Sequence, residues 1–182
     1  MATESLTLAD PTLDLAEAFW AMVEDFRAAG EGHHIPGASS HLETLPREEL
    51  PTFIQQLQES AHGLNLPPGY VPANYYWLLR GDGAIVGVSS LRHWLTPALE
   101  EVGGHIGYSI RPAARRQGYG TRILALSLEQ ARARGLDRVL VTCDTDNLGS
   151  ARVIQRNGGI LASAGHSDLT GTHVSRYWIA LA

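Results

Sequence analysis

The sequence predicts an α/β fold, in which a mixed sheet holds at least one parallel pair of strands joined by crossover helices. From residue 75 onward, strand patterns and helix patterns alternate along the chain, and this order is typical of parallel strands with helical connections. The chain has 182 residues, of which 44% are hydrophobic and 18% charged, which favours one folded globular domain over a disordered chain. We therefore expect a single domain over residues 1–182.

Before residue 70 the pattern is helical. Apolar residues recur at helical spacing over residues 14–29, after Pro11 and up to Gly30, and again over residues 47–61. The residues between these two helices, 30–46, have no period and contain Gly, Pro and Ser, which predicts a long loop.

The elements after residue 70 follow from shorter patterns. Apolar stretches on both sides of the turn Gly81-Asp82-Gly83 predict a β-hairpin. Strands are expected at residues 75–80, 84–91, 104–111, 138–143, 160–164 and 173–181, and helices at residues 119–134 and 148–157.

The charge of the chain limits its partners. A net charge of -5 argues against a nucleic-acid-binding protein, because such surfaces need clustered Lys and Arg. One dense basic cluster exists, and its small extent suits a few phosphate groups rather than a duplex. Its members are Arg111, Arg115, Arg116 and Arg122. No run of about 18 apolar residues occurs, so we expect no membrane span.

Cysteine and histidine usage indicates the compartment and argues against a metal. The single cysteine, Cys143, excludes an intramolecular disulfide and is expected to pack as a small hydrophobic residue. Residues 1–10 are acidic and polar, unlike a signal peptide, so we expect a cytoplasmic protein. The adjacent His33 and His34 have no second group of ligands at metal-binding spacing, so we expect no metal.

The most informative segment is residues 109–121, which reads S-I-R-P-A-A-R-R-Q-G-Y-G-T and lies between an expected strand and an expected helix. A helix N-terminus offers unpaired backbone N–H groups and a partial positive charge, and a Gly-rich turn before it forms a concave anion site. Gly118 and Gly120 allow the backbone to approach a ligand, while Arg115 and Arg116 add positive charge. The segment therefore predicts a phosphate site.

The context of this segment indicates which phosphate ligand it binds. The segment lacks both the Lys-Ser/Thr ending of a nucleotide P-loop and the full G-x-G-x-x-G of a dinucleotide site. R-R-Q-G-Y-G at a helix start, followed by the strand to Cys143 and by Asn147-x-x-Ser150, instead resembles the GNAT superfamily of acyl-CoA-dependent N-acetyltransferases. The resemblance covers residues 75–181, and residues 1–74 only as an expected N-terminal strand and pair of helices.

This resemblance implies a fold in more detail. The family has a twisted, mostly antiparallel sheet of about seven strands with helices on both faces. Its central parallel pair is splayed, and here that pair would be residues 104–111 and 138–143. Residues 1–70 would shape the acceptor site, and residues 71–182 would form the acyl-CoA-binding core.

The resemblance also implies acetyl-CoA as co-substrate, with its thioester between the splayed strands. Backbone N–H groups near Ser109 and Ile110 would pair with the pantetheine arm and polarise the acetyl carbonyl, as an oxyanion hole does. The residues expected to bind acetyl-CoA are Ser109, Ile110, Arg111, Arg115, Arg116, Gln117, Gly118, Tyr119, Gly120, Thr121, Asn147 and Ser150.

The sequence departs from the family pattern after Asn147. Many members carry a tyrosine seven residues later, thought to protonate the leaving thiolate, but this chain has Ile154 there, and Gly159 replaces a customary aromatic residue. Ser150 is a candidate acid in its place, with helix capping or pantetheine binding as the alternative role. Capping of the same helix is expected from Asp144 and Asp146, whose carboxylates come just before it.

Attack on a thioester needs an amine made neutral by a base, or by a proton chain through water. His105 is the first candidate, because it shares a strand face with Gly107 and Ser109 and an imidazole titrates near neutral pH. A structural hydrogen bond at the end of the strand is its alternative role. Glu101 is the second candidate base, and a solvated loop carboxylate is its alternative.

The sequence therefore predicts an N-acetyltransferase that moves an acetyl group from acetyl-CoA to a primary amine of a small molecule or peptide, by direct attack in a ternary complex. A non-catalytic acyl-CoA-binding or sensing module is the alternative, and a nucleotide-binding protein is a third interpretation. Glu17, Glu24 and Asp25 could attract a cationic amine or could form an ordinary solvated helix face. The final strands offer an edge for a homodimer.

Overall fold

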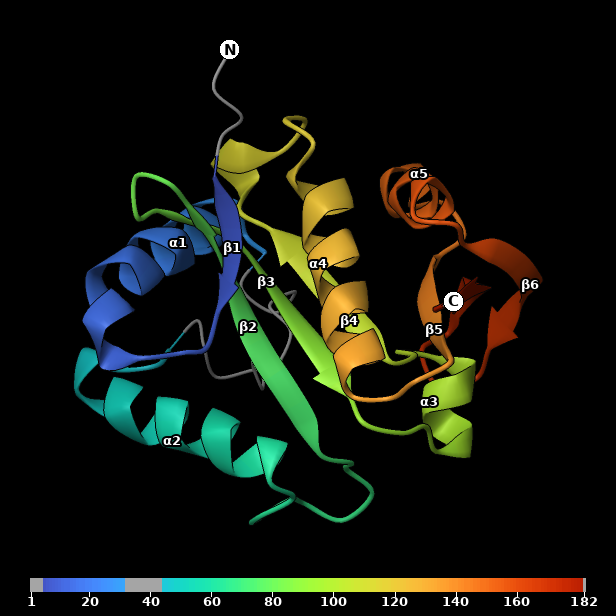
Figure 1. The fold of residues 1–182 in the computed structure, drawn as a ribbon, viewed down its shortest axis with the longest axis horizontal. Helices are drawn as coiled ribbons and strands as arrows, with labels where there is room; N and C mark the ends of the chain where they lie inside the picture. Colours follow the sequence, from blue (N-terminus) through green and yellow to red (C-terminus); the bar gives the residue numbers. More distant parts are fainter. Residues whose placement is uncertain (1–4, 32–43, 182) are drawn as a thin grey trace.

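The computed structural model describes residues 5–31 and 44–181, and their fold is shown in Figure 1. The strands are β1 (Leu6–Ala9), β2 (Ala73–Arg80), β3 (Ile85–Arg92), β4 (Ile106–Ile110), β5 (Arg138–Asp144), β6 (Ile160–Ser167) and β7 (Thr172–Ala180). The α-helices are α1 (Ala16–Ala28), α2 (Leu50–Ala61), α3 (Pro97–Glu101), α4 (Tyr119–Ala133) and α5 (Leu148–Arg156). Short 3-10 turns precede α1, α2 and α4, at Leu13–Leu15, Arg47–Glu49 and Pro112–Ala114.

The expected helices and strands are present, most of them within two residues of their predicted ends. The four-residue β1 is the N-terminal strand that the resemblance implied but the residue pattern did not locate, and the five-residue α3 had no expected counterpart. Elements of this length contain too few residues to show a period. The α3 helix begins at Thr96, whose hydroxyl accepts the Leu99 N–H, and Pro97 occupies its first turn.

The mixed α/β class is confirmed, but the strands do not form one continuous sheet. Strands β1, β2, β3 and β4 form one antiparallel sheet in that order, and β5, β7 and β6 form a second. The two sheets meet where the His105 N–H donates to the Leu140 carbonyl at 2.7 Å and the Gly103 N–H donates to Thr142 Oγ1 at 2.9 Å. Beyond this junction β4 and β5 separate, so the expected splayed pair is a boundary between sheets.

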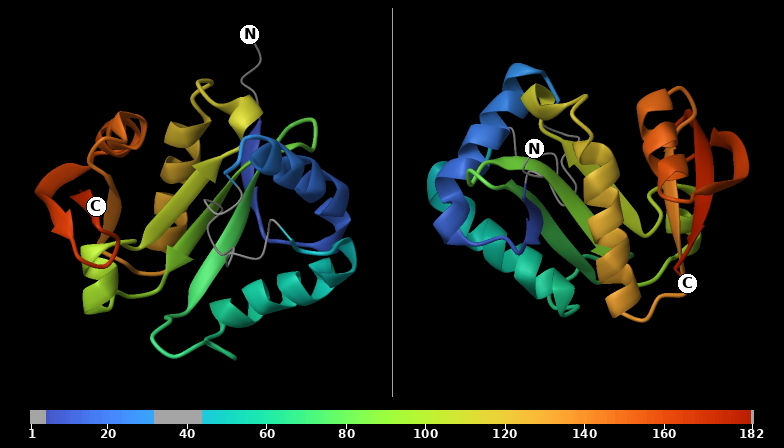
Figure 2. Two further views of the ribbon diagram at one scale, coloured as in Figure 1. Left: turned by 180° about the vertical axis from the view of Figure 1, so that it is seen from behind. Right: turned by 45° about the horizontal axis from the view of Figure 1, so that its top comes forward.

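Both faces of the four-stranded sheet are covered, as Figure 2 shows. On one face α1 and α2 bury an aromatic cluster, in which Phe19 stacks on Trp77 with ring centroids 5.0 Å apart. On the other face α4 buries Ile123 and Leu124 completely. Strand β4 lies at the edge of this sheet. One of its edges pairs with β3, and its other edge faces β5 across the gap between the two sheets.

Candidate functional site: a cleft between β4 and β5

The gap between β4 and β5 is a cleft of about 1290 Å³, with walls that also come from the starts of α4 and α5. The carboxyl-terminal parts of both strands line it, through Tyr108–Ile110 on β4 and Thr142–Asp144 on β5. Because the strands touch near their amino-terminal parts and diverge toward their carboxyl ends, they run in the same direction and form a V. A cleft of this size accommodates a ligand larger than a typical metabolite or drug.

One end of the cleft is the N-terminus of α4. Gly118 occupies the cap position with a φ of +87°, and no side chain from residues 5–31 or 44–181 caps the helix. The first backbone N–H groups of α4 therefore face the cleft without a side-chain acceptor, and the helix dipole adds positive potential there. Arg115 and Arg116 line the same end of the cleft. This arrangement is suited to a phosphate group.

Most of the residues predicted to bind acetyl-CoA lie together in this cleft. Those that line it are Ser109, Ile110, Arg115, Arg116, Gly118, Tyr119, Gly120, Thr121, Asn147 and Ser150. Two predicted residues do not line it. The Arg111 side chain forms an ion pair with Asp25 of α1, and the Gln117 amide donates to the Ala113 carbonyl at 3.4 Å.

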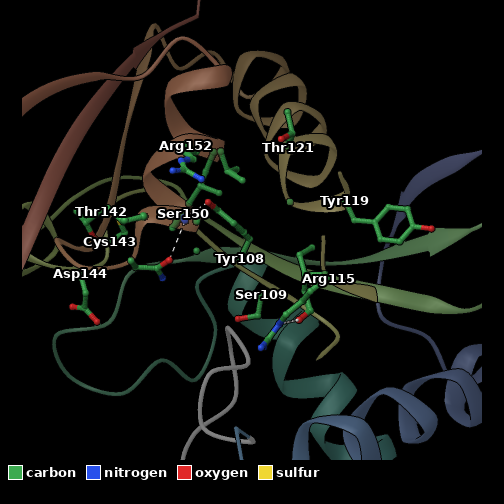
Figure 3. A pocket seen from close by; sticks show the side chains of 18 of the residues that line it. Tyr108, Ser109, Arg115, Tyr119, Thr121, Thr142, Cys143, Asp144, Ser150 and Arg152 are labelled. Atoms are coloured by element: carbon green, nitrogen blue, oxygen red, sulfur yellow. Dashed lines mark hydrogen bonds between the residues drawn. The ribbon is translucent and has the colours of Figure 1, made fainter. Parts of the chain in front are cut away.

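Two of the cleft residues are already engaged by other parts of the protein. The Tyr119 ring is buried in an apolar cluster with Ile123 and points away from the cleft in Figure 3, so only its backbone can meet a ligand. The Arg115 guanidinium pairs with Glu31, and its Nε donates to the Ile110 carbonyl at 3.1 Å. A phosphate ligand would therefore compete with Glu31 for Arg115.

A polar cluster lies deeper in the cleft, where β4 faces α5. Tyr108 and Ser150 point toward each other in Figure 3, and the Tyr108 hydroxyl lies 2.8 Å from Ser150 Oγ. Burial raises the pKa of Tyr108 to about 12, so this phenol keeps its proton at neutral pH. Cys143 packs against an apolar cluster as expected and also lines the cleft, and burial raises the pKa of its thiol.

Tyr108 was missed by the sequence analysis. It lies between Gly107 and Ser109 on the strand. Period-two alternation therefore assigns its side chain to the opposite face from the one on which the base was expected. Its 42-position separation from Ser150 leaves no local signal of their contact. Only the packing of α5 beside β4 brings the two hydroxyl groups together.

The start of α5 is capped by Asn147, not by Asp144 or Asp146 as expected. The Asn147 side chain accepts the Ser150 N–H at 3.0 Å, and Asp144 instead accepts the Thr172 hydroxyl at 3.1 Å. Since Asn147 also lines the cleft, its capping bond sets the position of an amide that a ligand can contact.

The two departures from the family pattern are in contact with each other. Ile154 is completely buried, and a Cβ built at Gly159 would lie 2.4 Å from Ile154 Cγ2 and 2.8 Å from the Ile154 carbonyl oxygen. The branched Ile154 therefore occupies the space that a side chain at position 159 would need. No acid can act from position 154 in this packing.

His105 joins the two sheets and does not line the cleft. Its Nδ1 accepts the Leu140 N–H at 2.9 Å, and burial followed by the charge of Arg92 lowers its pKa to about 4. A neutral imidazole that accepts at Nδ1 carries its proton at Nε2 and keeps no lone pair for a substrate proton. The geometry therefore favours the structural role over the role of base.

The lowered pKa of His105 predicts a loss of stability in acid. An unfolded histidine has a pKa near 6.5, so between about pH 6.5 and pH 4 the unfolded chain binds a proton that the folded chain does not. Stability is fully present above this range, and we expect about 2 to 3 kcal/mol of unfolding free energy to be lost on going down to pH 4. Urea unfolding at a series of pH values measures this slope.

The matched variant for this prediction is His105→Asn, whose amide oxygen can still accept the Leu140 N–H but does not titrate. Its stability should depend less on pH than that of the wild type. His93 contributes a residual slope, because burial and Arg134 lower its pKa to about 4 as well. His62→Asn, at the exposed end of α2, controls for loss of an imidazole. An unchanged slope in His105→Asn would contradict the prediction.

The second candidate base, Glu101, is held outside the cleft. Its carboxylate accepts the Ser167 hydroxyl, and its backbone carbonyl accepts Arg176 Nε at 2.8 Å. It therefore connects α3 to the second sheet. His33 and His34 lie outside the described residues.

The acidic residues of α1 are paired with arginines. Asp25 pairs with Arg111, Glu24 with Arg27 at 2.8 Å and Glu17 with Arg47 at 3.5 Å. They therefore offer little attraction for a cationic amine.

Within the described part of the chain, no group of three His, Cys, Asp or Glu side chains is arranged to hold a metal ion. Over residues 5–31 and 44–181, no helix is both long enough and apolar enough to cross a bilayer.

Comparison with known proteins identifies the family. A family model described as an acetyltransferase (GNAT) domain matches residues 5–160. No curated protein matches the sequence. Similar solved structures include ribosomal-protein-S5-alanine acetyltransferase from Vibrio fischeri, which is 17% identical with a TM-score of 0.72 and is matched over 99% of this chain and 95% of its own.

Two further similar structures are described as complexes with acetyl-CoA or coenzyme A. The microcin C7 self-immunity acetyltransferase MccE, in complex with acetyl-CoA and AMP, is 17% identical with a TM-score of 0.70, over 98% of this chain and 93% of its own. RimL, a ribosomal L7/L12 alpha-N-protein acetyltransferase in complex with coenzyme A, is 19% identical with a TM-score of 0.69, and the match covers 99% of this chain and 96% of its own. Identities this low establish the fold alone. Since the family model spans most of the sequence, however, this chain belongs to the GNAT acetyltransferase family.

Proposed function

We propose that this enzyme transfers the acetyl group of acetyl-CoA to a primary amine, by direct attack in a ternary complex. The observation that carries this proposal is the cleft between β4 and β5, which has the uncapped α4 N-terminus at one end and the Tyr108–Ser150 pair within it. Two of the structures similar to this chain are described as acetyltransferases for the N-terminal serine or the alpha-amino group of ribosomal protein L7/L12, which supports an amine acceptor.

The donor half of the cleft would hold acetyl-CoA. The pyrophosphate would lie at the start of α4, where backbone N–H groups, Arg115 and Arg116 provide donors and positive charge. The pantetheine arm would follow β4 toward Asn147 and Ser150, and the backbone near Ser109 and Ile110 would polarise the acetyl carbonyl. Residues 1–70 would shape the acceptor side, because α1 and α2 cover the sheet face opposite α4.

The chemical step moves one proton from nitrogen to sulfur. The amine nitrogen attacks the thioester carbon, a C–N bond forms and the C–S bond breaks, and the nitrogen loses a proton to water. In this step the Tyr108 hydroxyl would donate to Ser150 Oγ, 2.8 Å away, and the Ser150 proton would then be available to the leaving sulfur. The thiolate then takes its proton through Ser150 and Tyr108, and solvent restores the phenol.

Turnover separates this function from a non-catalytic acyl-CoA sensor. Release of free thiol from acetyl-CoA is measured with panels of amino acids, peptides, polyamines and aminoglycosides, and mass spectrometry identifies the acetylated product. The proposal predicts that at least one amine raises thiol release well above the rate with water. Tight binding of acetyl-CoA without acceleration by any amine would favour the sensor.

A charge reversal in the donor half tests the phosphate site. Arg116→Glu should remove most of the thermal stabilisation that coenzyme A gives, because Arg116 lines the α4 end of the cleft and makes no ion pair with a described residue. Its control is Arg132→Glu, on the exposed last turn of α4, which should be stabilised by coenzyme A as much as the wild type is. Equal stabilisation of both variants by coenzyme A, or stabilisation of the wild type by ATP as strong as by coenzyme A, would reject this site.

A further inference from the structure

The cleft has a second polar region that the donor half does not use. Ser90 and Arg92 of β3 line it from the face that α1 and α2 cover. In the register of β3 and β4, Ser90 lies opposite Gly107 and Val88 lies opposite Ser109. Since Gly107 has no side chain, nothing from β4 covers the space above Ser90 on this face. This region therefore adjoins the Ser109 backbone, where the thioester is proposed to lie.

Arg92 is a half-buried cation that no carboxylate of the described residues neutralises. Its Nη1 donates to the Gly103 carbonyl at 3.2 Å and to the Gly104 carbonyl at 3.1 Å, which holds the guanidinium in place. Burial lowers its pKa, and the side chains that partly oppose this effect are Tyr75 and Tyr70, not acids. Two carbonyls use a minority of the five N–H donors of a guanidinium. An anionic ligand would supply the missing partner.

Ser90 provides an independent observation. Ser90 is 2% exposed, and its hydroxyl has no hydrogen-bond partner among the described residues, which is rare for a buried polar group. The adjacent Ser89 faces α4 and receives a hydrogen bond from Ser127 at 3.0 Å. Of these two neighbouring serines, Ser89 is hydrogen-bonded within the sheet–helix interface, whereas Ser90 lines the cleft.

The charged side chains around this region indicate whether it binds a cation or an anion. Of the described carboxylates that line the cleft, Glu31 pairs with Arg115, and Asp144 accepts the Thr172 hydroxyl at 3.1 Å from β5, the opposite wall from Arg92. On the β3 side Arg92 is therefore available to bind an anion.

We infer that Arg92 and Ser90 form an acceptor subsite for a carboxylate, so that the preferred substrate is a primary amine with a carboxylate a few bonds away. This inference rests on the proposed function, because it assigns the acceptor of the same cleft. Ser90 lies two residues along β3 from the position opposite Ser109, which corresponds to about 7 Å. The attack distance to the thioester carbon and the hydrogen bond to the carboxylate each add about 3 Å, so an amine and a carboxylate separated by two to five bonds fit this spacing. Either an amino acid or a peptide with an acidic second residue has this chemistry.

Matched pairs of acceptors test the inference with the wild-type enzyme. Glycine, β-alanine and γ-aminobutyrate are compared with their carboxamides, and glycyl-glutamate with glycyl-glutamine, in the thiol-release assay. The carboxylate member of at least one pair should have a kcat/KM about 30-fold or more above its carboxamide. Preference within the first three pairs identifies a free amino acid, and preference confined to the dipeptide pair identifies a peptide N-terminus.

Two variants test whether Arg92 and Ser90 cause the preference for a carboxylate. Arg92→Gln removes the charge, so it should lower kcat/KM about 30-fold for the carboxylate acceptor and much less for its carboxamide. Ser90→Ala removes a hydroxyl that has no partner, so it should fold normally and raise the KM of the carboxylate acceptor several-fold. Arg132→Gln, on the exposed end of α4, is the control for loss of an arginine.

The outcomes separate failure of the inference from failure of the proposed function. If amines are acetylated but carboxylates and carboxamides react equally well, the function stands and the carboxylate subsite is rejected. The subsite is also rejected if Arg92→Gln and Ser90→Ala lower turnover equally for both members of a pair. If no amine is acetylated while coenzyme A still binds, the proposed function itself fails.

Discussion

Gly104→Ala is expected to destabilise the protein by about 3 kcal/mol, from strained backbone and from a clash at the junction of the two sheets. A Cβ at this position would lie 2.4 Å from the Leu140 carbonyl oxygen and 2.9 Å from its carbon. These are backbone atoms of β5, so no side chain can rotate away to relieve the contact. Gly104 also has a φ of +60°, which favours glycine.

Urea unfolding measures this loss, and Gly83→Ala is the matched control. Gly83 has a φ of +84°, but a Cβ there would meet no atom within 4 Å, so this variant reports the cost of the backbone conformation alone. That cost should be about 1 kcal/mol. A Gly104→Ala variant no less stable than Gly83→Ala would show that β5 can move freely away from β4.

The same substitution should also affect activity, because the clash pushes β5 away at the point where the V begins. The KM for acetyl-CoA should rise several-fold even at temperatures where the variant is fully folded. An unchanged KM would mean that the width of the cleft is set elsewhere, for example by α5.

Ser150→Ala is expected to lower kcat about 100-fold, because it removes the hydroxyl proposed to donate to the leaving sulfur. The fold should be unaffected, since Asn147 caps α5 through the backbone N–H of residue 150, which alanine retains. The KM for acetyl-CoA should change much less than kcat. Single-turnover thiol release measures the chemical step directly, and Ser163→Ala, on the exposed β6, is the control.

Tyr108→Phe and the double variant test whether the two hydroxyls act as one unit. Tyr108→Phe should lower kcat about 10-fold, and adding it to Ser150→Ala should cause little further loss, because Tyr108 acts through Ser150. Losses that multiply in the double variant would contradict the relay. Since the pKa of Tyr108 is about 12, it should cause no break in the kcat profile below about pH 10.

The prediction from sequence was strongest for features that depend on residues close together in the chain. Hydrophobic periodicity is local, so α1, α2, α4 and most strands were predicted near their observed positions. The turn before α4 is local too. Gly118 and the two arginines before it predict an anion site at a helix start, and the structure has an uncapped helix start at the edge of a large cleft.

Features that depend on contacts between distant segments could not be predicted in the same way. The division into two sheets depends on the close approach of Gly104 to Leu140, and the pairing of Tyr108 with Ser150 depends on how α5 packs beside β4. His105 was a plausible base by strand alternation. Its hydrogen bond to the Leu140 N–H gives it a different environment, which no strand period reveals.

The turn predicted to bind an anion and the order of helices and strands are thus properties of neighbouring residues, because backbone N–H groups, glycine φ angles and apolar spacing act over one or two turns of chain. The environment of each titratable or hydroxyl group is not local. It depends on which segments pack against it, which is why Ser90 has no partner in the described parts of the chain while Ser89, the residue before it, is hydrogen-bonded to Ser127. The proposed donor half of the cleft could therefore be predicted from the sequence, whereas the proposed proton path and the proposed carboxylate subsite depend on the packing.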